Sequence, residues 1–206
     1  MRTAGVDLAA EPAGTALAII DWTGSGVAAI DELLLGVADG VIVDAACTVD
    51  KIGVDCALGW PDAFVDFIAA HARSRPGGPP VDGGMDWRRT LAYRETDRHV
   101  RARTGRWPLS VSTDRLGLTA MRCAGLLDRL ARSGVDVDRS GAGGVVEVYP
   151  GASLRLWGFA PARYRTDPEA RERLLIALQD RAPWLDFGSH EGLMVHSADA
   201  FDAVLA

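Results

Sequence analysis

Three acidic residues stand inside apolar, strand-like stretches of the sequence. Asp7 lies within Gly-Val-Asp-Leu-Ala, Asp55 within Gly-Val-Asp-Cys-Ala-Leu, and Glu147 within Val-Val-Glu-Val-Tyr. A buried, ionised carboxylate is costly unless it is paired, hydrogen-bonded or bound to a metal ion. Few basic residues occur in these stretches, so a divalent cation would be the natural partner. Ligation by oxygen alone favours Mg²⁺, Mn²⁺ or Ca²⁺ over zinc.

A further acidic pair, Asp199 and Asp202, lies near the end of the chain. Residues three positions apart share one face of a helix, so the two carboxylates are expected to point the same way. Ser197 is a good N-cap, which places Asp199 in the first turn, where an acid is stabilised by the helix dipole without any function. We therefore prefer Asp202 as a metal ligand. His196 precedes this helix and is expected to be a cap or a surface residue rather than a ligand.

The elements that must position these acids are predicted from apolar periodicity and from turn residues. Strands are expected at Thr3–Ala10, Gly14–Trp22, about Gly26–Leu35, Lys51–Cys56 and Gly143–Tyr149, and helices at Ala38–Val49, Asp62–Arg73, Tyr93–Arg103, Thr113–Ser133, Pro168–Ala182 and Ser197–Ala206. The first three strands form an antiparallel meander, and the other two are parallel strands buried on both faces. This order predicts an α/β fold with a mixed five-stranded sheet.

The predicted sheet belongs to a single domain that covers residues 1–206. Its helical insertion, about residues 61–134, separates the fourth strand from the fifth. The Pro/Gly-rich stretch Arg75–Gly84 in this insertion is expected to be a loop that acts as a lid or hinge. Acids at the carboxyl ends of the parallel strands would meet at one edge, where ligands of open α/β sheets bind.

Composition excludes several classes of protein. The 206 residues are 48% hydrophobic, which excludes a disordered or fibrous chain, and 22 basic against 28 acidic residues give a net charge of −6. This charge argues against a protein that coats nucleic acid by bulk positive charge. No apolar run is long enough to span a membrane, and we expect a cytoplasmic protein without a membrane partner. Three widely spaced cysteines indicate neither a disulfide framework nor structural zinc.

A run of arginines between residues 86 and 106 offers candidate phosphate ligands. Arg94, Asp97 and Arg98 fall on one face of a predicted helix, where the two arginines could bind substrate phosphate. A solvated, salt-bridged helix face is the alternative for these residues. Some tryptophans could stack on bases, although packing is the expected role of most of them: Trp60, Trp87, Trp107, Trp157 and Trp184.

Five motifs recur in a known order along the chain. They are Gly5-Val-Asp-Leu-Ala9, Gly53-Val-Asp-Cys-Ala-Leu-Gly-Trp-Pro61, Arg94-Glu-Thr-Asp97, Glu147-Val-Tyr-Pro150 and Asp199-Ala-Phe-Asp-Ala203. Together they resemble a prokaryotic family of predicted RNase H-like nucleases, the domain-of-unknown-function family numbered four hundred and twenty-nine. The resemblance implies an RNase H-like core in which Asp7, Asp55 and Asp202 hold two Mg²⁺ or Mn²⁺ ions. Glu147 looks like an addition specific to this family, and the Arg94-Glu-Thr-Asp97 motif implies that Asp97 orients one of the neighbouring arginines.

The function expected on this basis is metal-dependent hydrolysis of a phosphodiester, with nucleic acid or another phosphodiester as the substrate. The catalytic candidates are Asp7, Asp55, Glu147 and Asp202, with Asp199 as a further metal ligand and Arg94, Asp97 and Arg98 as substrate-binding residues. One alternative is a non-catalytic binding or scaffold protein. Another is an actin-like nucleotide phosphotransferase, because Asp7 and the Gly14-Thr15 turn loosely resemble a first phosphate loop. A homo-oligomer is possible but is not indicated by the sequence.

Overall fold

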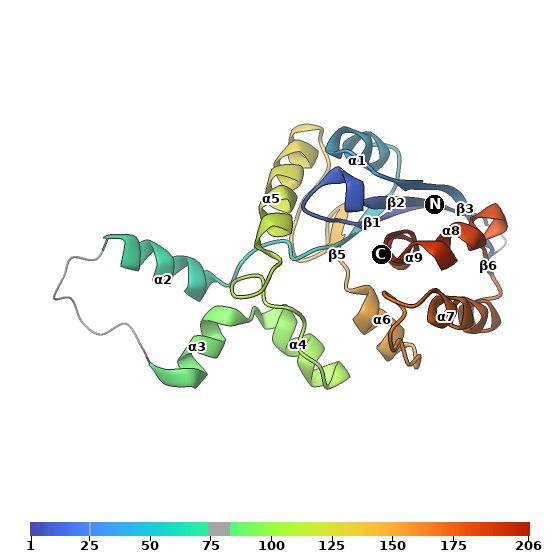
Figure 1. The fold of residues 1–206 in the computed structure, drawn as a ribbon. Helices are drawn as coiled ribbons and strands as arrows, with labels where there is room; N and C mark the ends of the chain where they lie inside the picture. Colours follow the sequence, from blue (N-terminus) through green and yellow to red (C-terminus); the bar gives the residue numbers. More distant parts are fainter. Residues whose placement is uncertain (25, 74–82) are drawn as a thin grey trace.

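The computed structural model describes residues 1–24, 26–73 and 83–206, which fold around a mixed six-stranded sheet (Figure 1). The strands are β1 (Arg2–Asp7), β2 (Ala16–Trp22), β3 (Ala28–Leu35), β4 (Lys51–Asp55), β5 (Val145–Glu147) and β6 (Leu185–Asp186). Their order across the sheet is β5-β4-β1-β2-β3-β6. The pairs β1–β2 and β2–β3 are antiparallel, whereas β1–β4, β4–β5 and β3–β6 are parallel.

The predicted α/β class, the antiparallel meander and the two parallel strands are confirmed, but the predicted count of five strands is wrong. The sixth strand, β6, consists of only two residues and pairs in parallel with the start of β3. Two residues are too few to produce an alternating pattern that sequence could reveal.

Nine α-helices occur in the described parts of the chain. They are α1 (Asp39–Ala46), α2 (Asp62–Arg73), α3 (Gly84–Ala92), α4 (Glu95–Thr104), α5 (Gly117–Arg132), α6 (Pro150–Leu156), α7 (Pro168–Arg181), α8 (Glu191–His196) and α9 (Ala198–Leu205). Helices α2 to α5 separate β4 from β5, and Figure 1 shows α2 and α3 extending away from the sheet. None of the helices in the described ranges is long and apolar enough to cross a membrane.

Three of these helices, α3, α6 and α8, were not predicted. The strand predicted to run to Tyr149 ends at Glu147, and Pro150 occupies the first turn of α6, where its missing N–H costs nothing. Helix α4 begins after Arg94, two residues later than expected, and ends at Thr104, where it is capped by Gly105, whose φ of 72° suits glycine. The predicted lid or hinge loop, Arg75–Gly84, lies mostly outside the described residues, and its last residue begins α3.

Each face of the sheet packs against its own group of helices. On one face, Leu17 and Ile19 of β2 join a core with α1 and α5, and on the other, Ala18 and Ile20 join a core with α7, α8 and α9. Both sets of side chains come from the same strand because successive residues point to opposite faces. The centre of the sheet is therefore buried on both sides, and β1 and β4 present their odd-numbered residues to α9.

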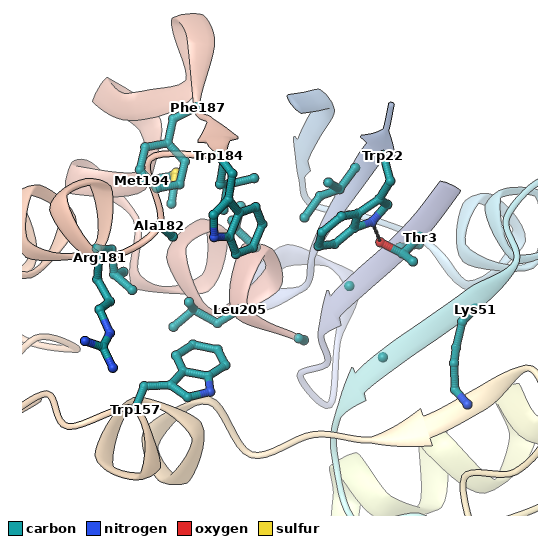
Figure 2. Close-up of a pocket in the computed structure, with 18 of the residues that line it drawn as sticks. Thr3, Trp22, Lys51, Trp157, Arg181, Ala182, Trp184, Phe187, Met194 and Leu205 are labelled. Carbon is teal, nitrogen blue, oxygen red and sulfur yellow. Dashed lines mark hydrogen bonds between the residues drawn. The ribbon is translucent and has the colours of Figure 1, made fainter. Parts of the chain in front are cut away.

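A cavity of about 640 Å³ lies on the α9 side, toward the amino ends of β1 and β4. Figure 2 shows Trp22 and Trp184 near the end of α9, and Trp157 on the other side of Leu205. The rings of Trp22 and Trp184 stack with their centroids 5.4 Å apart, and the indole of Trp22 donates a hydrogen bond to Thr3 Oγ1 at 2.9 Å. Trp157 and Trp184, two of the five tryptophans considered for base stacking, thus line an apolar cavity.

Candidate functional site

Asp7 and Asp55 are direct neighbours at the carboxyl ends of β1 and β4. They are register partners in the parallel pair, and each is the last residue of its strand. Both face α9. Asp7 is buried and Asp55 is half-buried. The two Gly-Val-Asp motifs therefore place two carboxylates side by side at one edge of the sheet, as the sequence predicted.

Helix α9 packs directly on these two strands because each carries a glycine two residues before its aspartate. Gly5 and Gly53 are also register partners. A Cβ atom on Gly5 would collide with the backbone oxygen of Ala203, and one on Gly53 with the backbone oxygen of Ala206. This close approach brings the aspartates of α9 to the same edge as Asp7. The glycine pair was not singled out from the sequence, although the repeated Gly-x-Asp pattern was a usable signal.

Both aspartates of α9 join the site. Ser197 caps the helix by accepting a hydrogen bond from the backbone N–H of Ala200 at 3.1 Å, which confirms the predicted N-cap. Asp202 is fully buried, whereas the side chain of Asp199 is 40% exposed. His196 points elsewhere, with its Nδ1 2.6 Å from the backbone oxygen of Gly192, and remains outside the cluster.

Arg165 is the cation that contacts all four carboxylates. Its guanidinium nitrogens lie 3.4 Å from Asp7 Oδ2, 3.9 Å from Asp55 Oδ2 and 3.7 Å from Asp199 Oδ1, and it also pairs with Asp202. We call these five side chains the acidic cluster. Sequence reasoning missed Arg165 because it lies in an irregular segment between α6 and α7, where no periodic pattern marks one arginine among many.

Tyr164, the residue before this arginine, orients the buried acid of α9. Its hydroxyl donates a hydrogen bond to Asp202 Oδ1 at 2.9 Å, and its ring packs against Phe201 with centroids 5.6 Å apart. Burial, together with the negative charge of Asp202, raises the pKa of the Tyr164 hydroxyl. The hydroxyl therefore remains a donor at neutral pH.

The acidic cluster carries more negative charge than Arg165 can balance. Burial raises the pKa of Asp7 to about 8, because desolvation and the neighbouring aspartates outweigh the attraction of Arg165. Burial and the charge of Asp202 raise the pKa of Asp55 to about 7. Burial also raises the pKa of Asp202 to about 6, although Arg165 and the Tyr164 hydroxyl oppose this shift. Raised carboxyl pKa values at one sheet edge are typical of a functional site.

Glu147, predicted as a fourth member of this group, is bound elsewhere. It ends β5, opposite Val54 rather than Asp55. Its carboxylate accepts two hydrogen bonds from Arg94, each 2.7 Å long, and one from the backbone N–H of Leu58 at 3.0 Å. It contributes to the electrostatic field at Asp55 but forms no ion pair with Arg165 in the described residues.

The predicted phosphate ligand Arg94 has its guanidinium occupied by acids. Asp97 accepts hydrogen bonds from the backbone N–H, Nε and Nη2 of Arg94 at 2.8, 3.1 and 2.8 Å, and Glu147 takes the other edge. Asp97 thus orients Arg94, as the resemblance to the family implied. Arg98 lies on the same helix, and its side chain is 39% exposed and pairs with Glu95 at 3.2 Å.

A groove of about 530 Å³ runs beside this pair, formed by the segment after β4 and by α4. Its polar lining includes Arg98 and Arg139, and Trp60 and Tyr93 contribute aromatic surface. Arg139 is exposed and donates a long hydrogen bond, 3.4 Å, to the backbone oxygen of Leu58. Trp107 stacks on Tyr93 at 4.0 Å. Of the three predicted substrate-binding residues, only Arg98 presents a partly free charge here.

The donor set of the acidic cluster fits a hard divalent cation, because it consists of carboxylate oxygens. Across residues 1–24, 26–73 and 83–206, however, no three His, Cys, Asp or Glu side chains are already arranged to hold an ion. The guanidinium of Arg165 lies among the carboxylates instead. The chemistry of the residues therefore suits Mg²⁺ or Mn²⁺, provided that Arg165 moves.

Comparison with known proteins identifies one family. A family model described as "Protein of unknown function (DUF429)" matches residues 5–206. No curated protein and no solved structure matches the chain significantly.

Proposed function

The chain belongs to this family of unknown function, and from its site we propose that it is a divalent-metal-dependent phosphodiesterase with an RNase H-like fold. One observation carries the proposal: four carboxylates from β1, β4 and α9 meet at one sheet edge around Arg165. The element order supports the fold, because an antiparallel meander is followed by a parallel strand and a C-terminal helix, each bearing an acid.

Asp7, Asp55 and Asp202 are the residues that would hold Mg²⁺ or Mn²⁺, with Asp199 as a more exposed fourth ligand. When bound, such ions activate a water molecule and stabilise the leaving oxygen of a phosphodiester. The protein's own contribution is to place the carboxylates that would hold these ions. The glycines of β1 and β4 let α9 approach, and Tyr164 fixes the orientation of Asp202 through its hydroxyl.

Substrate phosphates would be bound by Arg98 and Arg139 in the groove formed by the segment after β4 and by α4. A guanidinium recognises a phosphate through two parallel hydrogen bonds, which suits nucleic acid or another phosphodiester. Arg94 is excluded from this role, because Asp97 and Glu147 use its donors. Instead, its guanidinium connects the start of α4 to β5 through the hydrogen bonds to Glu147.

The alternative of a nucleotide phosphotransferase depended on the Gly14-Thr15 turn as a phosphate loop, and the contacts of Thr15 do not favour that role. The Thr15 hydroxyl is fully buried, donates to the backbone oxygen of Glu11 and accepts hydrogen bonds from Ala9 N–H and Arg122 Nη1, so it is not free to bind a phosphate. A non-catalytic scaffold would not require four carboxylates around one cation. Hydrolysis is therefore the function that the residues favour.

The test is a calorimetric titration with Mn²⁺ of the wild type, Asp7→Asn and Asp180→Asn. Asp180 is an exposed aspartate of α7, remote from the cluster, and serves as the matched loss of one charge. We expect saturable binding in the wild type and in Asp180→Asn, and its loss in Asp7→Asn. Hydrolysis of labelled single-stranded DNA and RNA should follow the same order. Equal Mn²⁺ binding in Asp7→Asn would contradict the proposal.

A further inference from the structure

The position of Arg165 within the acidic cluster has a consequence for any ion that binds there. Its Nη2 reaches Asp7 and Asp199, and its Nη1 reaches Asp55 and Asp202. Both ends of the guanidinium thus point into the space that the four carboxylates share. A divalent cation bound by the same oxygens would lie within a few ångströms of this guanidinium, and the two positive charges would repel each other strongly.

Arg165 can leave without disturbing the backbone that carries it. Its side chain is 48% exposed, whereas the neighbouring Tyr164 is buried. Tyr164 is fixed independently, because its hydroxyl bonds Asp202 and its backbone oxygen accepts a hydrogen bond from Arg171 Nη1 at 2.6 Å. The backbone oxygen of Arg163 accepts from the N–H groups of Thr166 and Asp167, each at 2.9 Å. Only a side-chain rotation is needed to free the carboxylates.

We propose that Arg165 is a resident counter-ion that occupies the cation position of the acidic cluster and is displaced when a divalent metal ion binds. The inference rests on the proposed function and concerns how access to that site is regulated. One guanidinium leaves a cluster of four carboxylates undercompensated, whereas a divalent ion brings twice the charge and direct oxygen coordination. Arg165 therefore protects the folded protein from repulsion among its acids and lowers the affinity of the site for metal.

A purely structural role of Arg165 makes the opposite prediction. If the guanidinium served to gather the carboxylates into a binding geometry, its removal would loosen the cluster and weaken metal binding. Competition predicts that removal strengthens metal binding. The sign of the change in affinity therefore separates the two roles.

The experiment is a calorimetric Mn²⁺ titration of the wild type, Arg165→Gln, Arg165→Lys and Arg173→Gln at one pH and ionic strength. Arg173 is 67% exposed on α7 and pairs only with Glu169 in the described residues, so it controls for the change in net charge. We expect Arg165→Gln to bind Mn²⁺ at least about tenfold more tightly than the wild type, because a nearby positive charge is removed. Arg173→Gln should stay within about twofold, since exposed charges are screened.

If Arg165→Gln fails to fold, Arg165→Lys still tests the proposal. Arg165→Lys retains a charge but loses the planar fork that reaches four carboxylates, so it should bind Mn²⁺ more tightly than the wild type by a smaller factor. Affinity equal to or below that of the wild type in the folded variants overturns the displacement and leaves the proposed function intact. Absence of Mn²⁺ binding in every variant overturns both.

Discussion

Arg94 and Glu147, 53 positions apart in the chain, form a bidentate ion pair in which Nη1–Oε2 and Nη2–Oε1 are both 2.7 Å. Asp97 binds the remaining donors of the same guanidinium. Burial alone would lower the pKa of Arg94, but the hydrogen bonds to Glu147 and Asp97 raise it, so the charge is permanent. The network ties the helical insertion to the edge strand β5 and so supports the groove beside it.

We expect Arg94→Met to destabilise the protein by about 3 kcal/mol or more, because it leaves one buried and one half-buried acid without their partner. The side chain of Asp97 is 3% exposed and that of Glu147 is 25% exposed, so water cannot fully replace the guanidinium. Urea unfolding monitored by circular dichroism measures the loss. Arg98→Met removes an exposed partner of Glu95 and should cost less than about 1 kcal/mol. Equal losses of unfolding free energy in both variants would show that the Arg94 network stabilises the protein no more than an exposed ion pair does.

The contact between Gly5 and α9 yields a second prediction. Gly5→Ala would push its new methyl carbon into the backbone oxygen of Ala203, and helix backbone cannot give way cheaply. We expect a loss of about 1 to 3 kcal/mol in unfolding free energy, as for other overpacked sites. Mn²⁺ affinity should fall as well, because α9 carries two of the four carboxylates.

The control for this substitution is Gly40→Ala. Gly40 lies in α1, where nothing is within 4 Å of the added carbon. Alanine is the better helix former, so this variant should be neutral or more stable by up to about 1 kcal/mol. Unfolding by urea would refute the close-packing argument if Gly5→Ala and Gly40→Ala behaved alike.

The convergence of Asp7 and Asp55 was predictable from local rules, whereas the place of Asp202 beside them was implied by the resemblance to the family. A carboxylate in an apolar run marks a buried acid, and parallel neighbours end at a common edge. The spacing of Asp199 and Asp202 then places both on one helix face. These inferences need only strand order and helical periodicity, which the sequence expresses within a few residues.

The partners of these acids were not predictable for a physical reason. The pairing of Glu147 with Arg94 and the placement of Arg165 join segments that are distant along the chain, and no local pattern encodes them. Glu147 was grouped with the other acids because its setting in an apolar strand is the same as theirs. What differs is the register of β5, whose last residue pairs one position short of Asp55. Short elements such as β6 were not predicted, because two residues are too few to form a recognisable pattern.

The raised carboxyl pKa values predict how stability depends on pH in the absence of metal. Asp7, Asp55 and Asp202 have pKa values of about 8, about 7 and about 6 in the folded protein, above the ordinary value of 3.8. The folded state therefore retains protons that the unfolded chain releases between the two values. Because stability falls with rising pH wherever the folded state binds more protons, the unfolding free energy should decrease from about pH 4 to about pH 8.

Asp7→Asn isolates the largest part of this effect, since an amide cannot ionise. Near pH 4 the wild type and Asp7→Asn should have similar unfolding free energies, because Asp7 is then mostly protonated in the folded state. Toward pH 8 the variant should become the more stable protein, by at least about 1 kcal/mol, since burying the Asp7 charge is no longer required. Urea unfolding in EDTA-containing buffers across this range measures the difference. A gap that stays constant or narrows as the pH rises would mean that Arg165 compensates the cluster fully.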